Sequence, residues 1–190
     1  MGLVVVYDAC VLFPAPLRDT LLRVAAKHLV QARWTERILD ETFRSILEQR
    51  PDLKPEQLVR TRSVMNEAFP DALVRGFEHR EAELTLPDLD DRHVLAAALE
   101  AGASVIVTNN LKDFPSHALG PLRVEARHPD EFLNGLVEYA PGPMLTAVQE
   151  QAAALKRPAQ TVEELLGTLR RCGLVRTVTR LQDLIRDTGA

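Results

Sequence analysis

The chain has 190 residues, of which 46% are hydrophobic, and this suits one domain of ordinary size with a real core and room for a small appendage. Aromatic residues make up only 5%, which disfavours the base-stacking platforms of many single-strand binders, and the net charge of −4 gives no global sign of a nucleic-acid binder. The two cysteines, Cys10 and Cys172, are far apart and lack the spacing of a zinc site or the context of a structural disulfide.

The first part of the chain predicts strands that alternate with helices. Leu3–Tyr7 is a continuous β-branched run, typical of a buried parallel strand, and Asp8 follows directly. An acid at the tip of a first strand often borders the ligand crevice of an α/β sheet, and we favour this interpretation over a turn or capping role. A short strand over 29–32 and a helix capped by Thr35 follow, and Glu41 flanks the apolar stripe of that helix as a solvated rim residue or as one that faces a cleft.

Three acids gather just before a later helix. Asp88, Asp90 and Asp91 fall within four residues, ahead of an apolar helix for which Gly102 fits the C-cap. One aspartate is explained by N-capping and by the helix macrodipole. Three acids exceed what a cap needs, and they repel one another unless a cation balances them. This excess is the first argument for a bound metal.

The next segments complete an α/β pattern. Residues 103–107 predict a buried strand, and a polar loop that ends in Asp113 lies past its C-terminal end. Residues 122–124 predict a final short strand, and a helix begins at Pro129. Strands that alternate with helices indicate a mostly parallel sheet covered by helices, so the predicted fold class is α/β.

Pro-Gly-Pro at 141–143 marks a boundary. The pattern of apolar residues after this boundary predicts only helices. Thr161 and Glu164 form a capping-box pattern at the start of one of these helices. The last two helices are amphipathic and must bury their apolar stripes on the main domain, on a second copy or on a partner. We therefore predict a main α/β domain over 1–140 and a C-terminal helical extension over 141–190.

Four scattered acids are candidates for a single site. Asp8, Glu41, Asp91 and Asp113 are far apart in the sequence, but a parallel sheet can bring strand ends and helix starts together. Oxygen ligands without a His or Cys cluster favour Mg²⁺ or Mn²⁺ over zinc. A carboxylate site of this kind typically acts on phosphate esters. The sequence has no P-loop and no visible Ser-His-Asp arrangement.

In their order along the chain, four segments resemble the PIN-domain family, most closely the branch of VapC-like toxins. They are Tyr7–Leu12, Ile38–Glu41, Pro87–Ala98 and Ile106–Pro115, and the resemblance spans roughly residues 1–135. It implies a metal-dependent ribonuclease on a three-layer α/β/α sandwich with a mostly parallel sheet.

The resemblance also implies roles for single residues. Asp8, Glu41 and Asp91 match the three acids with which the family holds Mg²⁺ or Mn²⁺. Many members have a fourth aspartate where this chain has Asn110, while Asp113 matches a second acid often found in this loop. Losing one negative charge leaves open whether the site holds one metal or two.

The residues around these acids receive supporting roles. Asn110 can supply a neutral oxygen ligand or orient a water, and the family suggests that Thr108 positions the scissile phosphate or a ligating water. For Asp88 and Asp90 we expect capping or support behind the ligands.

The predicted function is therefore an endoribonuclease that hydrolyses RNA phosphodiester bonds, as the toxin of a type II toxin–antitoxin pair. The resemblance implies a homodimer and an antitoxin that blocks the acidic crevice, commonly with an arginine. A reducing cytoplasm is expected, since the N-terminus lacks a basic signal region and no apolar run approaches the ~20 residues of a membrane span.

Two alternatives stay open. A different α/β phosphohydrolase with Asp8 as nucleophile is disfavoured, because Cys10 occupies the second place of the Asp-x-Asp pair expected there. A catalytically weakened PIN-like module that binds RNA or protein gains support from Asn110 and from the acidic net charge.

Overall fold

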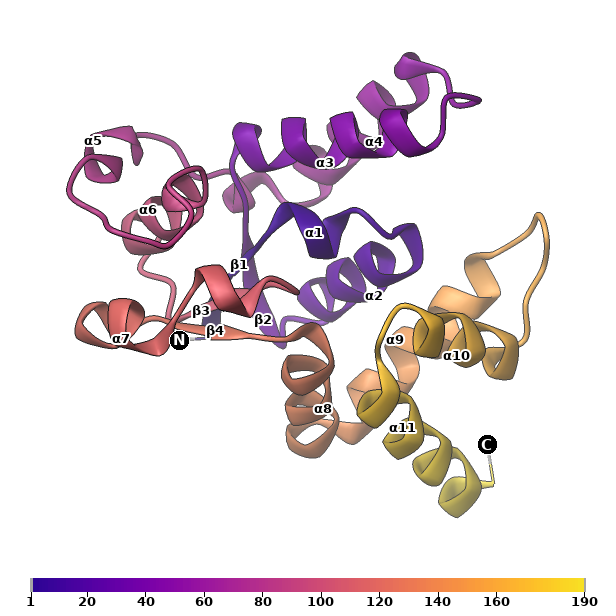
Figure 1. Ribbon diagram of the computed structural model, residues 1–190. Coiled ribbons are helices and arrows are strands. Elements are labelled where there is room, and N and C mark those ends of the chain that lie inside the picture. The colour runs from indigo at the N-terminus through magenta and orange to yellow at the C-terminus, as the bar shows by residue number, and fades with distance from the viewer. Residues whose placement is uncertain (1, 190) are drawn as a thin grey trace. The chain divides into compact units, whose positions relative to one another are not determined.

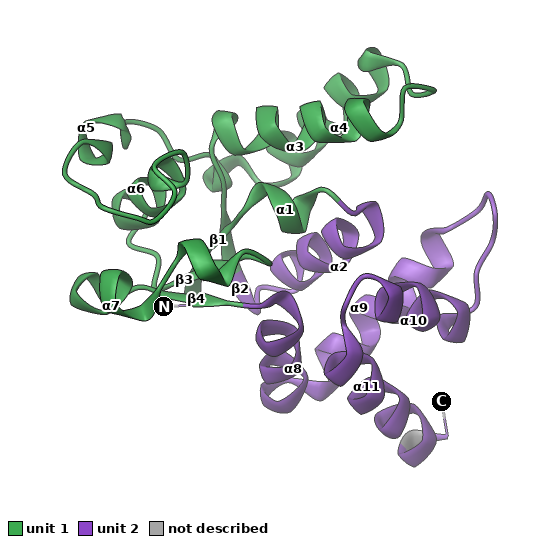
Figure 2. Cartoon of the chain, in the orientation of Figure 1, with its two compact units in different colours: residues 1, 3–13, 31–127 green, residues 2, 14–30, 128–190 purple. Residues whose placement is uncertain are grey.

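The computed structural model describes residues 2–189, which form two compact units (Figures 1 and 2). Beyond the first two residues, one unit comprises 3–13 and 31–127 and is called the sheet unit here. The other comprises 14–30 and 128–190 and is called the helical unit. The division into 1–140 and 141–190 stays a prediction.

A four-stranded sheet forms the centre of the sheet unit. The strands are β1 (Leu3–Tyr7), β2 (Val30–Arg33), β3 (Val105–Val107) and β4 (Glu125–Arg127), in the order β2-β1-β3-β4. β1 and β4 both pair with β3 in parallel, and Val6 lies opposite Ile106. The central residues of β1 and β3 are β-branched and fully buried. This is the pattern of parallel strands that are covered on both faces. The predicted α/β class with a mostly parallel sheet and C-terminal helices is confirmed.

Short and long helices surround the sheet within this unit. They are α1 (Ala9–Leu12), α3 (Glu36–Gln49), α4 (Pro55–Ala68), α5 (Glu78–Glu81), α6 (Arg92–Glu100) and α7 (Ser116–Leu119), with 3₁₀ turns at Pro70–Ala72, Leu111–Asp113 and Gly120–Leu122. α6 packs on β1 and β3, and α1 packs on α3. Two predicted ends are confirmed: the Thr35 hydroxyl caps α3 by accepting from the Ile38 amide at 3.0 Å, and Gly102 ends α6 with φ +62°.

The strand order places a crevice at one edge of the sheet. From β1 the chain proceeds to β2 on one side, and β3 pairs on the other side. In open α/β sheets, ligands bind at such a switch point, outside the carboxyl ends of the strands. Asp8 follows the end of β1, and Thr108 follows the end of β3.

One expectation about local structure is wrong. Residues 122–124, which we predicted as a strand, do not form one. Leu122 ends the 3₁₀ turn Gly120–Leu122, and Arg123 has a left-handed backbone conformation (φ 57°), so the strand begins only at Glu125. The Pro-Gly-Pro segment at 141–143 lies where α8 (Pro129–Tyr139) gives way to α9 (Pro141–Ala154), and it forms the first turn of α9, because proline lacks only an amide that has no partner at a helix start.

The helical unit consists of five helices. They are α2 (Ala15–Ala26), α8 (Pro129–Tyr139), α9 (Pro141–Ala154), α10 (Val162–Arg171) and α11 (Val175–Thr188). The predicted capping box at α10 is confirmed, since the Thr161 amide donates to Glu164 Oε2 at 2.8 Å and the Glu164 amide donates to Thr161 Oγ1 at 3.2 Å.

Buried polar contacts tie the helices of this unit together. Gln151 of α9 accepts a hydrogen bond from the Thr20 hydroxyl of α2 at 2.8 Å and donates one to the Pro16 carbonyl at 2.9 Å. Asp130 of α8 accepts from the Thr177 amide and hydroxyl, at 2.9 and 2.8 Å, and thereby caps the start of α11. Losing the Asp130 carboxylate would leave the buried Thr177 amide without its acceptor.

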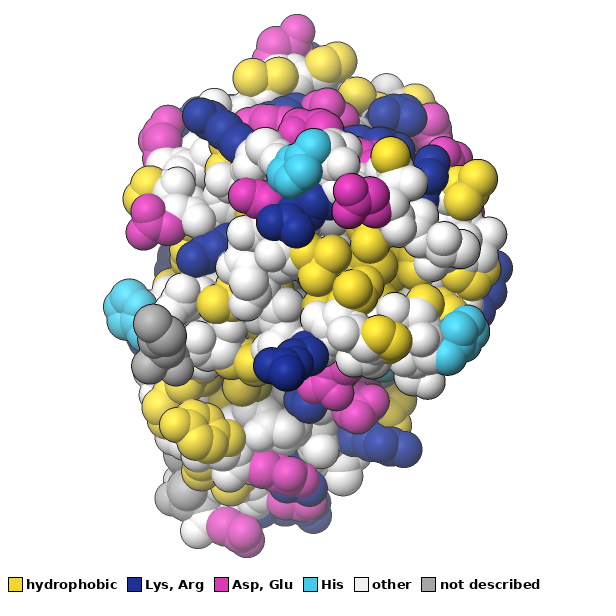
Figure 3. Space-filling view, turned by 90° about the vertical axis from the view of Figure 1, so that its left-hand side faces the viewer, with side chains coloured by type: hydrophobic (Ala, Val, Ile, Leu, Met, Phe, Trp, Pro, Cys, Tyr) yellow, Lys and Arg dark blue, Asp and Glu magenta, His cyan; other side chains and the backbone are white. Residues whose placement is uncertain are grey.

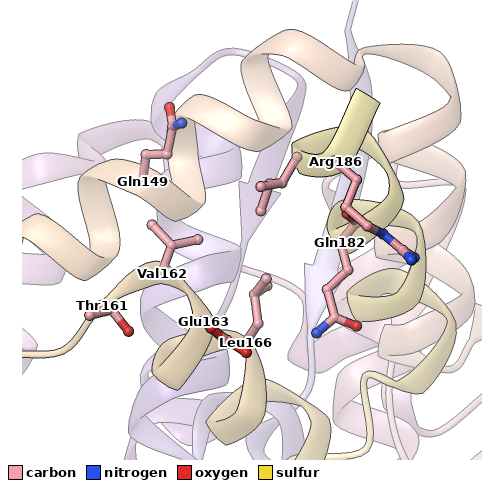
Figure 4. Close-up of a pocket in the computed structure, with 8 residues that line it drawn as sticks. Gln149, Thr161, Val162, Glu163, Leu166, Gln182 and Arg186 are labelled. Carbon is pink, nitrogen blue, oxygen red and sulfur yellow. The ribbon is translucent and has the colours of Figure 1, made fainter. Parts of the chain in front are cut away.

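A hollow of about 590 Å³ lies among α9, α10 and α11 (Figure 4). Val162, Leu166 and Ile185 give it apolar walls, and Glu163 is the one carboxylate among its described lining residues. Within residues 2–189, no helix has the length and apolar character needed to cross a bilayer.

Candidate metal centre

Asp8 is fixed by three hydrogen bonds at the carboxyl end of β1. Its Oδ1 accepts from the Ala9 amide at 2.7 Å, and its Oδ2 accepts from the Thr108 hydroxyl at 2.6 Å and from the Cys10 thiol at 3.1 Å. Asp8 is only 7% exposed. The carboxylate therefore has one orientation before any ligand binds, as a site at the end of this strand requires.

Thr108 connects this carboxylate to the loop after β3. Its hydroxyl accepts a hydrogen bond from the Asn110 amide at 3.0 Å while it donates to Asp8, and the residue is fully buried. The Asn110 side chain in turn donates to Asp113 Oδ2. A single buried hydroxyl thus sets the relative positions of Asp8 and the loop that carries Asp113.

Thr108→Val should therefore disturb both ends of the network. Valine has nearly the same shape but leaves the Asn110 amide without its acceptor and Asp8 without one donor, so we expect a loss of about 1–3 kcal/mol in the free energy of unfolding. Urea unfolding measures this loss. Thr108→Ser retains the hydroxyl and serves as the control, and equal stability of the Val and Ser variants would contradict the role assigned to the hydroxyl.

Asp91 occupies the N-cap position of α6, but its side chain makes no capping hydrogen bond. Among residues 2–189, its Oδ2 is one of the buried side-chain oxygens without a hydrogen-bond partner. Burial, followed by the charges of Asp8, Asp88 and Asp113, raises the pKa of Asp91 to about 6. The capping explanation for this acid therefore fails, and the carboxylate remains available for a cation.

Three carboxylates form a cluster at this place. Oxygen atoms of Asp88, Asp91 and Asp113 all lie within 4.8 Å of one another. Asp88 also accepts a hydrogen bond from the Asp90 amide at 2.9 Å, which turns the chain ahead of α6. We expected Asp88 to support the ligands, whereas its carboxylate lies beside Asp91 and Asp113. The side chain of Asp90 belongs to neither this cluster nor the groove described below.

Glu41 is held by the side chains of His93 and Arg37. Its Oε1 lies 3.2 Å from Nε2 of the buried His93 and accepts from Arg37 Nε at 3.3 Å. Burial alone would raise the pKa of Glu41, but the hydrogen bond and charge of His93, together with Arg37, outweigh burial and keep the pKa below its usual range. Glu41 is therefore ionised at neutral pH.

A groove of about 370 Å³ joins four of the eight predicted site residues. Asp8, Glu41, Asp91 and Asn110 line it together. The hollow of the helical unit is larger, but with its single described carboxylate it offers no comparable donor set. Size therefore does not identify the functional site here, whereas the chemistry of the lining does.

The donor set fits a hard divalent cation. The cluster and the groove bring carboxylate and amide oxygens together, and one buried oxygen of Asp91 lacks a partner among the described residues. Burial, followed by repulsion from the neighbouring acids, raises the pKa of Asp91. Mg²⁺ and Mn²⁺ prefer such oxygens, and a cation would relieve the repulsion. Asp88, Asp91 and Asp113 are the residues best placed to hold it, with Asp8 at the adjoining wall of the groove.

Sequence reasoning missed three neighbours of these acids. Cys10, which we noted only as an odd replacement for aspartate, donates to Asp8 and accepts from the Asn109 amide at 3.2 Å. Burial and the charge of Asp8 raise the pKa of Cys10 to about 12, so the thiol stays protonated as a donor. His93 was missed because pairing across helices leaves no periodic signal, although its position two residues after Asp91 was a hint. Arg37 was overlooked although it lies four residues before Glu41 on the same helix, a spacing that brings side chains together.

The surface gives no broad electrostatic attraction for a polyanion on the face drawn in Figure 3. Acidic and basic side chains are interspersed there, in keeping with the net charge of −4. A phosphate that approaches the acidic cluster would be repelled unless a cation were bound. The site's own chemistry therefore matters more than its surroundings.

Comparison with known proteins agrees with this geometry. Residues 4–112, more than half of the chain, match the family model described as PIN domain, and residues 129–183 match the model described as VapC50 C-terminal domain. A stretch of 43 residues is 63% identical to a protein of Mycobacterium tuberculosis (strain ATCC 25618 / H37Rv) described as "Putative ribonuclease VapC50". The match covers 23% of this chain and 25% of that relative. No solved structure matches. On the strength of the family model and the sheet topology, the chain belongs to the PIN-domain family, of the VapC-like type.

Proposed function

We propose that this protein is a metal-dependent endoribonuclease that hydrolyses RNA phosphodiester bonds. The observation that carries the proposal is the carboxylate cluster of Asp88, Asp91 and Asp113, beside the groove lined by Asp8 and Glu41. Family membership and the short match to a protein described as a ribonuclease support the choice of RNA as the substrate.

In this proposal the residues of the site have different roles in binding the cation and positioning the water. A bound Mg²⁺ or Mn²⁺ would polarise the scissile phosphate and lower the pKa of an attacking water. Asp91 and Asp113, with Asp88, would hold the cation, and Asp8 would orient the water or complete the ligands from the end of β1. Glu41, ionised between His93 and Arg37, completes the acidic shell. Asn110 fixes Asp113 by its side-chain hydrogen bond.

Cleavage of single-stranded RNA by the purified chain tests the proposal. We expect cleavage with Mn²⁺, none with a chelator, and a rate at least ~100-fold lower for Asp8→Asn, since removing a group that stabilises developing charge costs about that much. Circular dichroism should show an unchanged fold. Cleavage by Asp8→Asn at the wild-type rate would contradict the proposed site.

The similarity to VapC-like proteins supports a further proposal, that the protein is the toxin of a toxin–antitoxin pair. A small partner that places an arginine in the groove would neutralise the acids and exclude a cation. A homodimer and a cytoplasmic location belong to the same proposal. Co-expression with the product of a short neighbouring reading frame tests it, because an antitoxin should copurify and suppress cleavage.

A non-enzymatic PIN-like module is the second candidate function. It is favoured by Asn110, which stands where many members of the family have an acidic ligand. The side-chain amide of Asn110 donates a hydrogen bond to Asp113. A Mn²⁺ titration distinguishes the two functions. No binding up to millimolar metal would support the module, whereas saturable binding would support the nuclease.

A further inference from the structure

The groove at the acids extends well beyond them along α3. Glu41, Ser45 and Gln49 all line it, at positions i, i+4 and i+8 of the helix. This spacing places them on one helix face over ~12 Å of axis. Only Glu41 belongs to the acidic site, so two helical turns of the wall lie outside the region that a single phosphate and its metal occupy.

Another part of the lining is built by α1 and the residue that caps it. Ala9, Cys10 and Phe13 line the groove, and α1 packs on α3. Phe13 follows the last residue of α1, where its amide bonds to the Ala9 carbonyl at 2.9 Å. The Phe13 side chain is partly buried, so its ring is held in place while it contributes to the lining. An aromatic side chain at a nucleic-acid site commonly stacks on a base.

The charges of the lining indicate what this end of the groove binds. None of its described lining residues is lysine or arginine, which phosphate contacts normally require. Ser45 and Gln49 are neutral, and each both donates and accepts hydrogen bonds. Amide side chains of this kind pair with base edges, and a hydroxyl suits a base or a ribose. A phosphate is therefore disfavoured here, and a nucleoside is favoured.

We propose that this end of the groove is a nucleoside subsite, in which the base beside the scissile phosphate packs against Phe13 and is read by Ser45 and Gln49. The inference rests on the proposed function, because it assumes that an RNA lies with its scissile phosphate at the acids. It adds that the enzyme selects its cleavage position by one base, and it assigns that selection to the last two turns of α3.

The test uses a set of single-stranded RNA oligonucleotides that share one cleavable linkage and differ only in the nucleotide on either side of it. We expect the wild-type protein to prefer one base by at least about fivefold, the lower end of what a well-formed side-chain–base pair provides. Gln49→Ala should remove most of this preference, and Ser45→Ala should reduce it. Gln49→Glu, which has only acceptors when ionised, should shift the preference toward bases that present a donor.

Glu48→Ala is the matched control, because Glu48 is exposed next to Gln49 but does not line the groove. It should retain the wild-type preference. The Mn²⁺ affinity of each variant, measured by calorimetry, should equal that of the wild type, since neither Ser45 nor Gln49 lies in the carboxylate cluster.

The outcomes separate the two proposals. A wild-type protein that cuts RNA, with an unchanged base preference in both Gln49 variants, would overturn the subsite and leave the nuclease standing. A wild-type protein that cuts none of the RNAs would overturn the nuclease and the subsite with it. If Gln49→Ala fails to fold, the shifted preference of Gln49→Glu decides.

Discussion

Asp91→Asn is expected to abolish RNA cleavage and, at the same time, to stabilise the metal-free protein. Cleavage should fall by ~10³-fold or more, because the metal supplies several kcal/mol of transition-state stabilisation and each ~1.4 kcal/mol corresponds to a factor of ten. Few substitutions at a structural residue would remove activity and raise stability together, so the combination identifies a site that is strained until a cation binds.

The sign of the stability change follows from the pKa. The folded-state pKa of Asp91 is raised from 3.8 to about 6, so the folded state disfavours the ionised form. The penalty is fully present above pH 6, shrinks as the pH falls, and vanishes below the unfolded-state value near 4. Because the residue is partly exposed, we reduce the nominal value for solvent screening and expect a gain of about 1 kcal/mol at pH 7.5.

Chemical unfolding of wild type and Asp91→Asn at pH 7.5 and pH 4, both with chelator, measures the effect. The gain should be present at pH 7.5 and absent at pH 4. Asp90→Asn is the matched control, since Asp90 is the adjacent acid but lies outside the cluster and the groove. A destabilised Asp91→Asn variant at pH 7.5 would show that this carboxylate is structural.

Mn²⁺ should raise the thermal stability of the wild-type protein strongly at pH 7.5 and much less at pH 5. At a free concentration 100 times the dissociation constant, binding contributes ~2.7 kcal/mol. For a chain of this length each kcal/mol shifts Tm by ~2–4 °C, so a rise of ~5–10 °C is expected. The cation must displace the proton of Asp91 below its pKa of about 6, so the affinity at pH 5 should be ~10-fold weaker.

Thermal unfolding with Mn²⁺, and with NaCl at equal ionic strength, measures this shift. NaCl screens the repulsion among the acids without binding between them and should raise Tm only slightly. The Asp91→Asn variant should show little shift with Mn²⁺ at either pH. An equal Tm rise at pH 5 and pH 7.5 in the wild type would mean that the metal binds without Asp91.

The sequence was informative where one local pattern decides the structure. The β-branched run before Asp8 predicted β1, and Thr35 and Gly102 predicted the ends of two helices, because caps and buried strands depend on neighbouring residues. The strand predicted at 122–124 was wrong because the turn that starts at Gly120 sets where the strand begins. The apolar residues Leu122 and Val124 suggested a strand there, but an apolar pattern alone does not determine at which residue a strand begins.

The site was predictable in its chemistry but not in its contacts. An excess of acids pointed to a cation, yet only the fold reveals that Asp88 lies with Asp91 and Asp113, or that His93 and Arg37 hold Glu41. The contacts of His93 with Glu41 and of Asp113 with the other two acids join segments far apart in the chain, where no spacing rule applies. Arg37 and Glu41, by contrast, are four residues apart on one helix, so this ion pair could have been predicted from the sequence. Asn110 was recognised as a departure, but its hydrogen bond to Asp113 required the loop geometry.

The buried hydrogen bonds between α2 and Gln151 bear on how far the chain can be shortened. α2 lies between β1 and β2 in the chain, within the stretch that matches the PIN domain, whereas Gln151 lies in the stretch that matches the VapC50 C-terminal domain. Thr20 and Pro16 have their partners in that second stretch. Removing the C-terminal helices would take these partners from α2, so a version of the chain that ends before α9 is expected to be less stable than the full chain.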